Sequence, residues 1–274
     1  MRYFRICTII LFVASLIFTG WTNYWYYSNL NTDSPTLSNS VGTLELSVTD
    51  PPEAIYRGLT AADATDGDLT DQIMVASVSH FLEPGLVKVK YVVFDSHNNA
   101  ATLSRRVHYT DYQGPRFTME KAPVYNVGTS FDLLDHIQVT DCLDGDISDR
   151  VRIIANMVNN YSEGTYPVIL EVSNSCGDTA QLTLWVHYQR KASNVAIQLH
   201  QYIVYQEQDT EFDPYQYIAS VADINLNPLD PKDVEIRGIL DMETPGTYQL
   251  VYSYEQGNLT GKSAITVIVT ERQA

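Results

Sequence analysis

Apolar and polar residues alternate along most of the chain after residue 43. The alternation is clearest in three runs, at residues 44–48, 87–93 and 103–109. Each run is short and is bounded by Gly, Pro, Asn or Asp. A period of two residues broken by turn residues is typical of strands with one buried face. Because no stretch after Tyr27 has the period of an amphipathic helix, the sequence predicts an all-β chain.

An acidic stretch occurs twice with its residues in the same order. Residues 62–73 align with residues 140–151 at an offset of 78, so that Asp-Gly-Asp at 66–68 matches Asp-Gly-Asp at 144–146. Further along, Val-His-Tyr at 107–109 matches Val-His-Tyr at 186–188. Self-similarity at a fixed spacing indicates repeated copies of one structural unit.

A third copy begins at about Asn194. It keeps Pro-Gly-Thr-Tyr at 245–248 where the second copy has Glu-Gly-Thr-Tyr at 163–166. It lacks the Asp-Gly-Asp loop, which residues 222–227 replace. The acidic loop is therefore dispensable for the fold. Units of 70 to 80 residues built from short strands predict small β-sandwiches.

These motifs resemble a known family. Asp66 to Thr70, the Pro84-Gly85 pair and the turn from Asp95 to Asn99 are similar to the bacterial immunoglobulin-like domain that was first named from a pesticidal crystal protein. The resemblance covers most of residues 43–272. It implies a surface-protein module and brings no shared catalytic residues. The chain departs from the family at Asn98, where Gly is usual, and at the added Cys142 and Cys176.

The predicted fold is therefore three tandem immunoglobulin-like β-sandwiches after an N-terminal transmembrane helix. The predicted boundaries are residues 1–27 for a signal anchor, 28–42 for a flexible linker rich in Ser, Thr and Asn, 43–112 for the first domain, 113–190 for the second and 191–272 for a divergent third.

The N-terminus has the pattern of a membrane anchor. Arg2 and Arg5 precede an apolar run at residues 6–20, and Trp and Tyr residues follow as far as Tyr27. Positive charge, an apolar run and an aromatic belt predict a single pass through residues 6–27, with the C-terminal part extracellular. The alternative is a cleaved signal peptide, although small residues are poorly placed for cleavage.

Charge separates the N-terminal segment from the rest of the chain. All 33 Asp and Glu follow Tyr27 together with 15 of the 17 Lys and Arg, which gives the exported part a formal charge of −18. Such a surface repels nucleic acid, so no nucleic-acid partner is expected. The charge itself has two interpretations, solubility or attraction for divalent cations and basic partners.

The acidic loops of the first copy are candidate calcium ligands. Carboxylate and amide oxygens suit Ca²⁺, and two loops of an immunoglobulin-like sandwich meet at one end. The candidates are Asp63, Asp66, Asp68, Asp95 and Asn99. The alternative is that these side chains close turns, which Asp and Asn do commonly.

Two cysteines of the exported part are candidates for a disulfide bond. Cys142 and Cys176 occur only in the second copy, in loops that the repeat places at one end of the sandwich. Outside the cytoplasm such thiols can oxidise, so a bond between them is predicted. The alternative is two free thiols.

No motif for a nucleophile, a phosphate loop or a zinc site appears, and we expect no enzyme. The predicted function is a cell-surface spacer, adhesion or protein-interaction module. The alternative is a carbohydrate- or cell-wall-binding module, or a non-catalytic accessory of an exported enzyme. The partner would be a surface protein or a polysaccharide. Trp185, on the outward face, could stack on a sugar or cover a neighbouring domain, while His108 and His187 are expected to be solvated.

Overall fold

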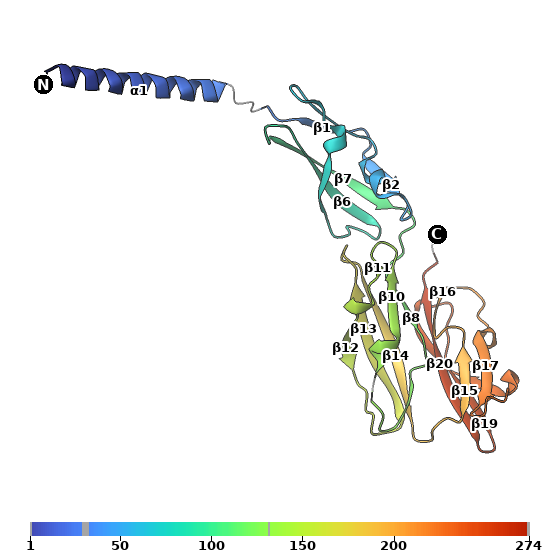
Figure 1. The fold of residues 1–274 in the computed structure, drawn as a ribbon. Helices are drawn as coiled ribbons and strands as arrows, with labels where there is room; N and C mark the ends of the chain where they lie inside the picture. Colours follow the sequence, from blue (N-terminus) through green and yellow to red (C-terminus); the bar gives the residue numbers. More distant parts are fainter. Residues whose placement is uncertain (1, 29–32, 131, 273–274) are drawn as a thin grey trace. The chain divides into compact units, whose positions relative to one another are not determined.

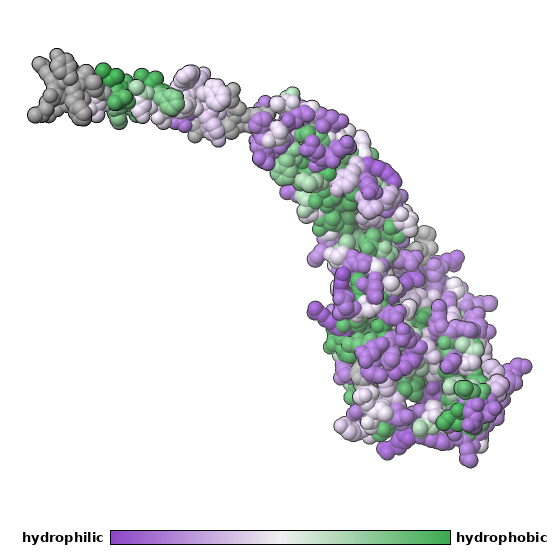
Figure 2. Space-filling model, in the orientation of Figure 1, coloured by the Kyte–Doolittle hydropathy of each residue, from purple (hydrophilic) through white to green (hydrophobic). Residues whose placement is uncertain are grey.

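The computed structural model describes residues 2–28, 33–130 and 132–272, with the side chains of residues 2–7 and 27–28 excepted. The side chains of Arg2 and Arg5 thus lie outside the described residues. Helix α1 (Arg2–Ser28) carries the apolar stretch Thr8–Tyr26, whose side chains are exposed (Figure 2). By length and composition this stretch can cross a membrane, a property that signal sequences share.

The rest of the chain is β-structure arranged in pairs of sheets, as the alternation predicts (Figure 1). The first sandwich pairs a sheet of order β1-β3-β4 with a sheet of order β2-β7-β6-β5. Its strands are β1 (Thr36–Asn39), β2 (Thr43–Leu46), β3 (Leu59–Asp63), β4 (Gly67–Asp68), β5 (Met74–Val78), β6 (Leu86–Phe94) and β7 (Ala100–Tyr109).

Strand β1 corrects one predicted boundary. It lies within residues 28–42, which the sequence assigned to a flexible linker. It pairs antiparallel with β3, with Thr36 opposite Ala62 and Asn39 opposite Leu59. Four residues rich in Ser, Thr and Asn give no clear periodic signal. Pairing with a distant strand, rather than local propensity, makes this segment a strand.

The second sandwich repeats the arrangement. It pairs a sheet of order β11-β10-β8 with a sheet of order β12-β13-β14-β9, in which β9 is an edge strand parallel to β14. Its strands are β8 (Arg116–Met119), β9 (Val124–Asn126), β10 (Ile137–Asp141), β11 (Gly145–Asp146), β12 (Arg152–Asn156), β13 (Gly164–Ser173) and β14 (Thr179–Gln189).

The third sandwich pairs β15 and β17 with a sheet of order β16-β20-β19-β18. Its strands are β15 (Val195–Leu199), β16 (Ile203–Glu207), β17 (Ile218–Asp223), β18 (Val234–Arg237), β19 (Gly246–Gln256) and β20 (Leu259–Thr270). The described connections also contain the 3₁₀ helices η1 (Pro52–Tyr56), η2 (Thr70–Gln72), η3 (Leu133–His136), η4 (Ser148–Arg150), η5 (Pro214–Tyr217) and η6 (Pro231–Asp233).

The chain forms two compact units. The first comprises residues 1–46, 50–79 and 88–108, and the second comprises residues 47–49, 80–87 and 109–274, so that the second and third sandwiches belong together. Their separate cores contain Phe117, Leu170 and Leu184 on one side and Tyr252 and Ile265 on the other, each at most 1% exposed. Burial of such side chains is the main favourable term in folding.

The second and third sandwiches pack side by side (Figure 1). Ile203 of β16 is 4% exposed and joins the core of the second sandwich. The backbone N–H of Phe117 donates a hydrogen bond of 2.8 Å to the Tyr205 hydroxyl. This apolar and hydrogen-bonded contact makes the two sandwiches one compact unit.

The same contact buries a histidine that the sequence placed in solvent. His187 is 6% exposed, and its Nε2 lies 2.6 Å from Oε1 of Gln249. Trp185 is half-buried, and its carbonyl accepts a 2.9 Å hydrogen bond from Gln249. The outward face of β14 is therefore an interface between sandwiches, because β19 lies against it. His108 remains partly exposed, beside Glu45.

Candidate functional site

The two acidic loops of the first sandwich meet at one end, as the repeat predicts. The backbone N–H of Ser96, in the loop between β6 and β7, donates a 2.9 Å hydrogen bond to Oδ2 of Asp66, in the loop after β3. The alternation fixes both strand ends, and the sandwich fold brings them together. Asp66 and Asp95 are thus neighbours in space.

The predicted ligands Asp63, Asp68 and Asp95 all close turns. Oδ1 of the buried Asp63 accepts from the N–H groups of Thr65 and Asp66 at 2.8 and 3.0 Å, and Oδ1 of Asp68 accepts from the Thr70 N–H at 2.9 Å. The hydroxyl and N–H of Thr70 lower the pKa of the Asp68 carboxyl. These contacts have the geometry of Asx turns.

Asp95 organises the neighbouring turn. Its Oδ1 accepts from the N–H groups of His97 and Asn99, both at 2.8 Å, and its Oδ2 accepts from the Asn99 side chain at 2.7 Å. Burial opposes ionisation, but the hydrogen bonds from Asn99 and His97 prevail and lower the pKa of Asp95. The Asn99 amide nitrogen also donates to the carbonyl of Asp33.

One group of side chains could hold a cation. Ligand atoms of Asp66, Asp95 and His97 all lie within 4.8 Å of one another. His97 was missed by the sequence argument because the second copy has Cys176 in its place. Asp63 and Asp68, two of the predicted ligands, lie outside this group. Calcium binding by the first sandwich therefore stays a prediction.

In the second sandwich, an arginine side chain provides the positive charge at the equivalent position. Asp144 accepts from Nη1 of Arg150 at 2.6 Å and from the N–H and hydroxyl of Ser175 at 2.8 and 2.6 Å. Burial opposes ionisation here also, but the hydrogen bonds from Ser175 and Arg150 lower the pKa of Asp144. Residue 72 of the first sandwich, which aligns with Arg150, is Gln. The two copies thus share a turn and differ in charge.

The structure does not contain the predicted disulfide bond. Cys142 and Cys176 are both free thiols, although their loops meet at the same end of the sandwich. Sγ of Cys142 instead donates to the carbonyl of Gln113 at 2.9 Å. Burial, the largest cause, raises the pKa of both thiols. Each is therefore mostly protonated at neutral pH and weakly nucleophilic.

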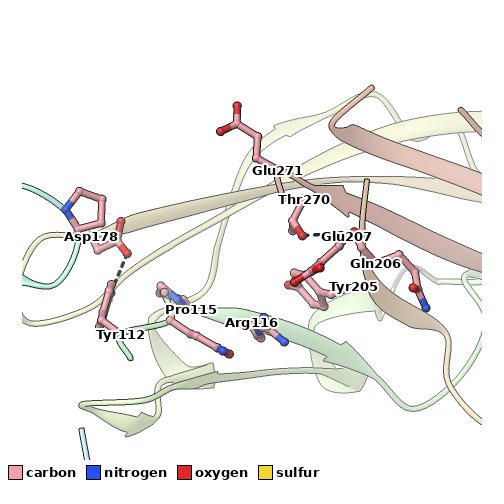
Figure 3. Close-up of a pocket in the computed structure, with 12 residues that line it drawn as sticks. Tyr112, Pro115, Arg116, Asp178, Tyr205, Gln206, Glu207, Thr270 and Glu271 are labelled. Atoms are coloured by element: carbon pink, nitrogen blue, oxygen red, sulfur yellow. Dashed lines mark hydrogen bonds between the residues drawn. The ribbon is translucent and has the colours of Figure 1, made fainter. Parts of the chain in front are cut away.

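A cleft of about 520 Å³ adjoins this end of the second sandwich (Figure 3). The Tyr112 hydroxyl donates a 2.7 Å hydrogen bond to Asp178. A Cβ at position 114 would lie 2.6 Å from Asp178 Oδ2, so a larger residue than Gly114 would displace this carboxylate. Across the cleft the Arg116 guanidinium lies over the Tyr205 ring at 5.0 Å. Glu207 and Glu271 also line the cleft, which is polar and largely acidic.

Turn closure by Asp63 gives the first testable prediction. We expect Asp63→Ala to lower the free energy of unfolding of the first compact unit by about 2 kcal/mol, because two N–H groups lose a buried acceptor. Urea unfolding with and without a chelator measures this, and Asp68→Ala at the exposed turn is the matched, milder control. A loss that appears only with calcium present, and that Asp66→Asn reproduces, would contradict turn closure and assign a metal.

The fold and loops define a class of protein: an all-β chain of immunoglobulin-like sandwich domains that follows an N-terminal apolar helix. No family model matches the chain. Its sequence is 25% identical over 210 residues to pesticidal crystal protein Cry22Aa of Bacillus thuringiensis. That match covers 71% of this chain and 27% of Cry22Aa, so the chain spans about a quarter of that protein's length. The similarity is distant.

Solved structures match the chain only with low TM-scores. The structure of CBM51-2 in complex with GlcNAc and INT domains from Clostridium perfringens ZmpB matches with 18% identity and a TM-score of 0.24, over 54% of this chain and 26% of that chain. The lipoprotein BT2262 from Bacteroides thetaiotaomicron matches with 12% identity and a TM-score of 0.21, over 85% and 98%. TM-scores this low carry no functional information.

Proposed function

We propose that the protein is a membrane-anchored surface module whose immunoglobulin-like sandwiches act outside the cytoplasm as a spacer, adhesion or protein-interaction element. The observation that supports this most directly is α1, an apolar helix whose described side chains are exposed. A long apolar helix with exposed side chains is suited to a bilayer. The acidic, β-rich remainder is suited to water.

The site chemistry supports binding rather than catalysis. The Asp68, Asp95 and Asp146 carboxylates are engaged in turns and Asp144 is paired with Arg150, and the pKa values of all four lie below the ordinary value. A general acid or base at neutral pH needs a carboxyl pKa raised toward 7. The loops therefore offer a surface for recognition.

Polysaccharide binding is the second candidate, and the cleft of Figure 3 is the feature that favours it. Tyr112, Arg116 and Glu271 offer hydrogen-bonding groups of the kind that bind sugar hydroxyls. Trp185, which the sequence offered for stacking on a sugar, is half-buried beside the third sandwich. A pull-down on purified cell wall separates this candidate from the first.

Topology is the direct test of the proposed anchor. Protease added to intact cells is expected to remove the C-terminal part of the chain, because the anchor leaves everything after residue 27 outside. An antibody against residues 259–270 detects the loss, and a cytoplasmic protein is the control for cell integrity. A variant without residues 8–26 should stay in the cytoplasm and be protected. Full protection of the intact chain would contradict the proposal.

A further inference from the structure

The turn after β17 exposes two large aliphatic side chains. Ile224 is 77% exposed and Leu226 is 84% exposed. In the first two sandwiches this position carries the Asp-Gly-Asp loop, which is polar. Exposed aliphatic residues that lie two positions apart in a short turn form an apolar surface that water solvates poorly. Contact with another molecule would bury it.

The turn holds these side chains in place. Oδ1 of Asp223 accepts from the N–H groups of Asn225 and Asn227 at 2.8 and 2.9 Å, and its Oδ2 accepts from the Asn227 side chain at 2.9 Å. The Leu226 N–H donates to the Asp223 carbonyl at 2.9 Å. The aliphatic pair is therefore presented on a fixed backbone.

A turn of the same kind occurs in the other two sandwiches at a different place, between their last two strands. Asp95 in the first and Asn174 in the second make equivalent hydrogen bonds. The third residue after each adopts a left-handed backbone: Asn98 at φ 65°, Gly177 at φ 80° and Leu226 at φ 64°. Asn and Gly tolerate this conformation, whereas leucine is strained in it. Leucine thus occupies a position where it is both strained and exposed, which points to a role in contact.

A groove of about 470 Å³ lies beside the turn, and two sheet edges line it. Val124 and Asn126 come from β9, the edge strand of its sheet, and Ala196 comes from β15. Ile224 and Leu226 complete the apolar part of the lining.

Strand β9 has backbone groups at its free edge, away from β14, that can form hydrogen bonds. It pairs with β14 through Pro123, Tyr125 and Val127, so the residues between them direct their backbone groups to the opposite edge. No hydrogen bond to the Val124 carbonyl or from the Asn126 N–H is present among the described residues. An unpaired strand edge is a template for an added strand.

The charged residues of the groove indicate which partner side chains would fit. Lys262 lines the groove, and the Asp223 carboxylate on its rim is already satisfied by the turn. Lys262 and Asp223 are the two charged residues of the described lining, so the groove is close to neutral in a chain of net charge −16. The Lys262 ammonium is complementary to a carboxylate on the partner.

We propose that this groove binds an extended segment of a partner protein, which adds a strand to β9, packs aliphatic side chains on Ile224 and Leu226, and places an acidic residue near Lys262. The inference rests on the proposed role as an interaction module and names its site and partner class. A glycan would be served better by exposed aromatic rings, and an acidic protein repels anionic lipid.

The test uses the full chain in phosphatidylcholine nanodiscs and a library of phage-displayed dodecapeptides. Panning is expected to enrich peptides with aliphatic residues at alternate positions and one acidic residue. For a synthetic enriched peptide, fluorescence polarisation should show at least about tenfold weaker binding to Leu226→Asn, because one aliphatic contact is lost. Leu226→Asn should melt at the same or a higher temperature, since Asn suits the left-handed backbone. Lys262→Glu should also weaken binding.

Ile239→Asn is the matched control, because Ile239 is 85% exposed and does not line the groove. It should leave the affinity unchanged. Hydrogen exchange should show that the peptide protects the Asn126 amide. Equal binding by Leu226→Asn, enrichment without an alternating aliphatic pattern, or self-association of the wild type that Leu226→Asn abolishes would each overturn the proposal. The protease experiment tests the surface location separately. A negative result for peptide binding would therefore contradict the binding groove and not the proposed function.

Discussion

Replacing Arg105 by methionine is expected to lower the free energy of unfolding of the first compact unit by about 3 kcal/mol. Arg105 is 4% exposed and has no carboxylate partner among the described residues. Its guanidinium instead donates to the carbonyls of Ile55 and Arg57 at 2.5 and 2.6 Å and to Asn39 Oδ1 at 3.1 Å. Methionine fills much of the same volume but donates nothing.

The expected loss follows from the acceptors that would stay behind. Two carbonyls at the end of η1 and one amide oxygen on β1 would each lose a hydrogen bond from a charged donor at a partly buried site, at about 1 kcal/mol each. The Ile55 carbonyl would keep its bond from the Tyr91 hydroxyl and the Asn39 oxygen its bond from the Val41 N–H, so the Arg57 carbonyl is the most affected. The guanidinium also lies 5.1 Å from the centre of the Tyr91 ring, and that cation–π contact would be lost. Arg105 therefore connects η1 and β1 to β7.

Native-state hydrogen exchange measures this effect separately in each unit. Protection of the Val89 and Tyr91 amides should fall in Arg105→Met, while protection of the Leu170 amide in the second unit stays the same. Arg106→Met is the matched control, because Arg106 is the exposed neighbour on the same strand. A loss below about 1 kcal/mol would show that water replaces the guanidinium without cost.

Acidification from pH 7 to pH 5 is expected to destabilise the second compact unit through His187. Burial, the largest cause, lowers the pKa of His187 below its ordinary value of 6.5, and the nearby Lys262 lowers it further, while the hydrogen bond with Gln249 opposes the shift. The folded state therefore keeps the imidazole neutral at a pH where the unfolded chain has bound a proton. Neutral His187 donates from Nε2 to Gln249 and accepts at Nδ1 from the Thr165 hydroxyl.

The sign follows from proton linkage. Above about pH 6.5 both states are neutral at this residue and the stability is complete. Below that value the unfolded state gains a proton first, so the free energy of unfolding falls by up to about 1.4 kcal/mol per pH unit until the folded pKa is reached. Carboxylates with lowered pKa values, such as Asp144, lose their contribution only as the pH falls below 3.8. The losses of stability from His187 and from the carboxylates therefore occur in separate pH ranges.

Urea unfolding followed between pH 7 and pH 5 tests this. His187→Gln keeps a donor toward Gln249 and cannot titrate, so its stability should be nearly flat over the range. His108→Gln, at the partly exposed histidine of the first sandwich, should keep the wild-type dependence of the second unit. An unchanged slope in His187→Gln would place the titrating group elsewhere.

The sequence by itself determined the fold class and the position of the acidic loops. Alternation fixed the strands and their inward faces, including the placement of Arg105 on the same face as Val107. The repeat fixed the loops, and the contacts of Asp66 with Ser96 and of Asp144 with Ser175 confirm that they meet in pairs. These features are local or periodic, so each copy carries the information for its own sandwich.

Only the tertiary structure decided what those residues contact. His187 and Trp185 lie on an outward face by alternation, yet β19 of the next sandwich covers that face. Residues 36–39 became a strand through pairing with β3, and His97 joined Asp66 across two loops. A period of two residues identifies the face on which a side chain lies. What covers that face depends on packing between segments distant in sequence, and no local pattern encodes it.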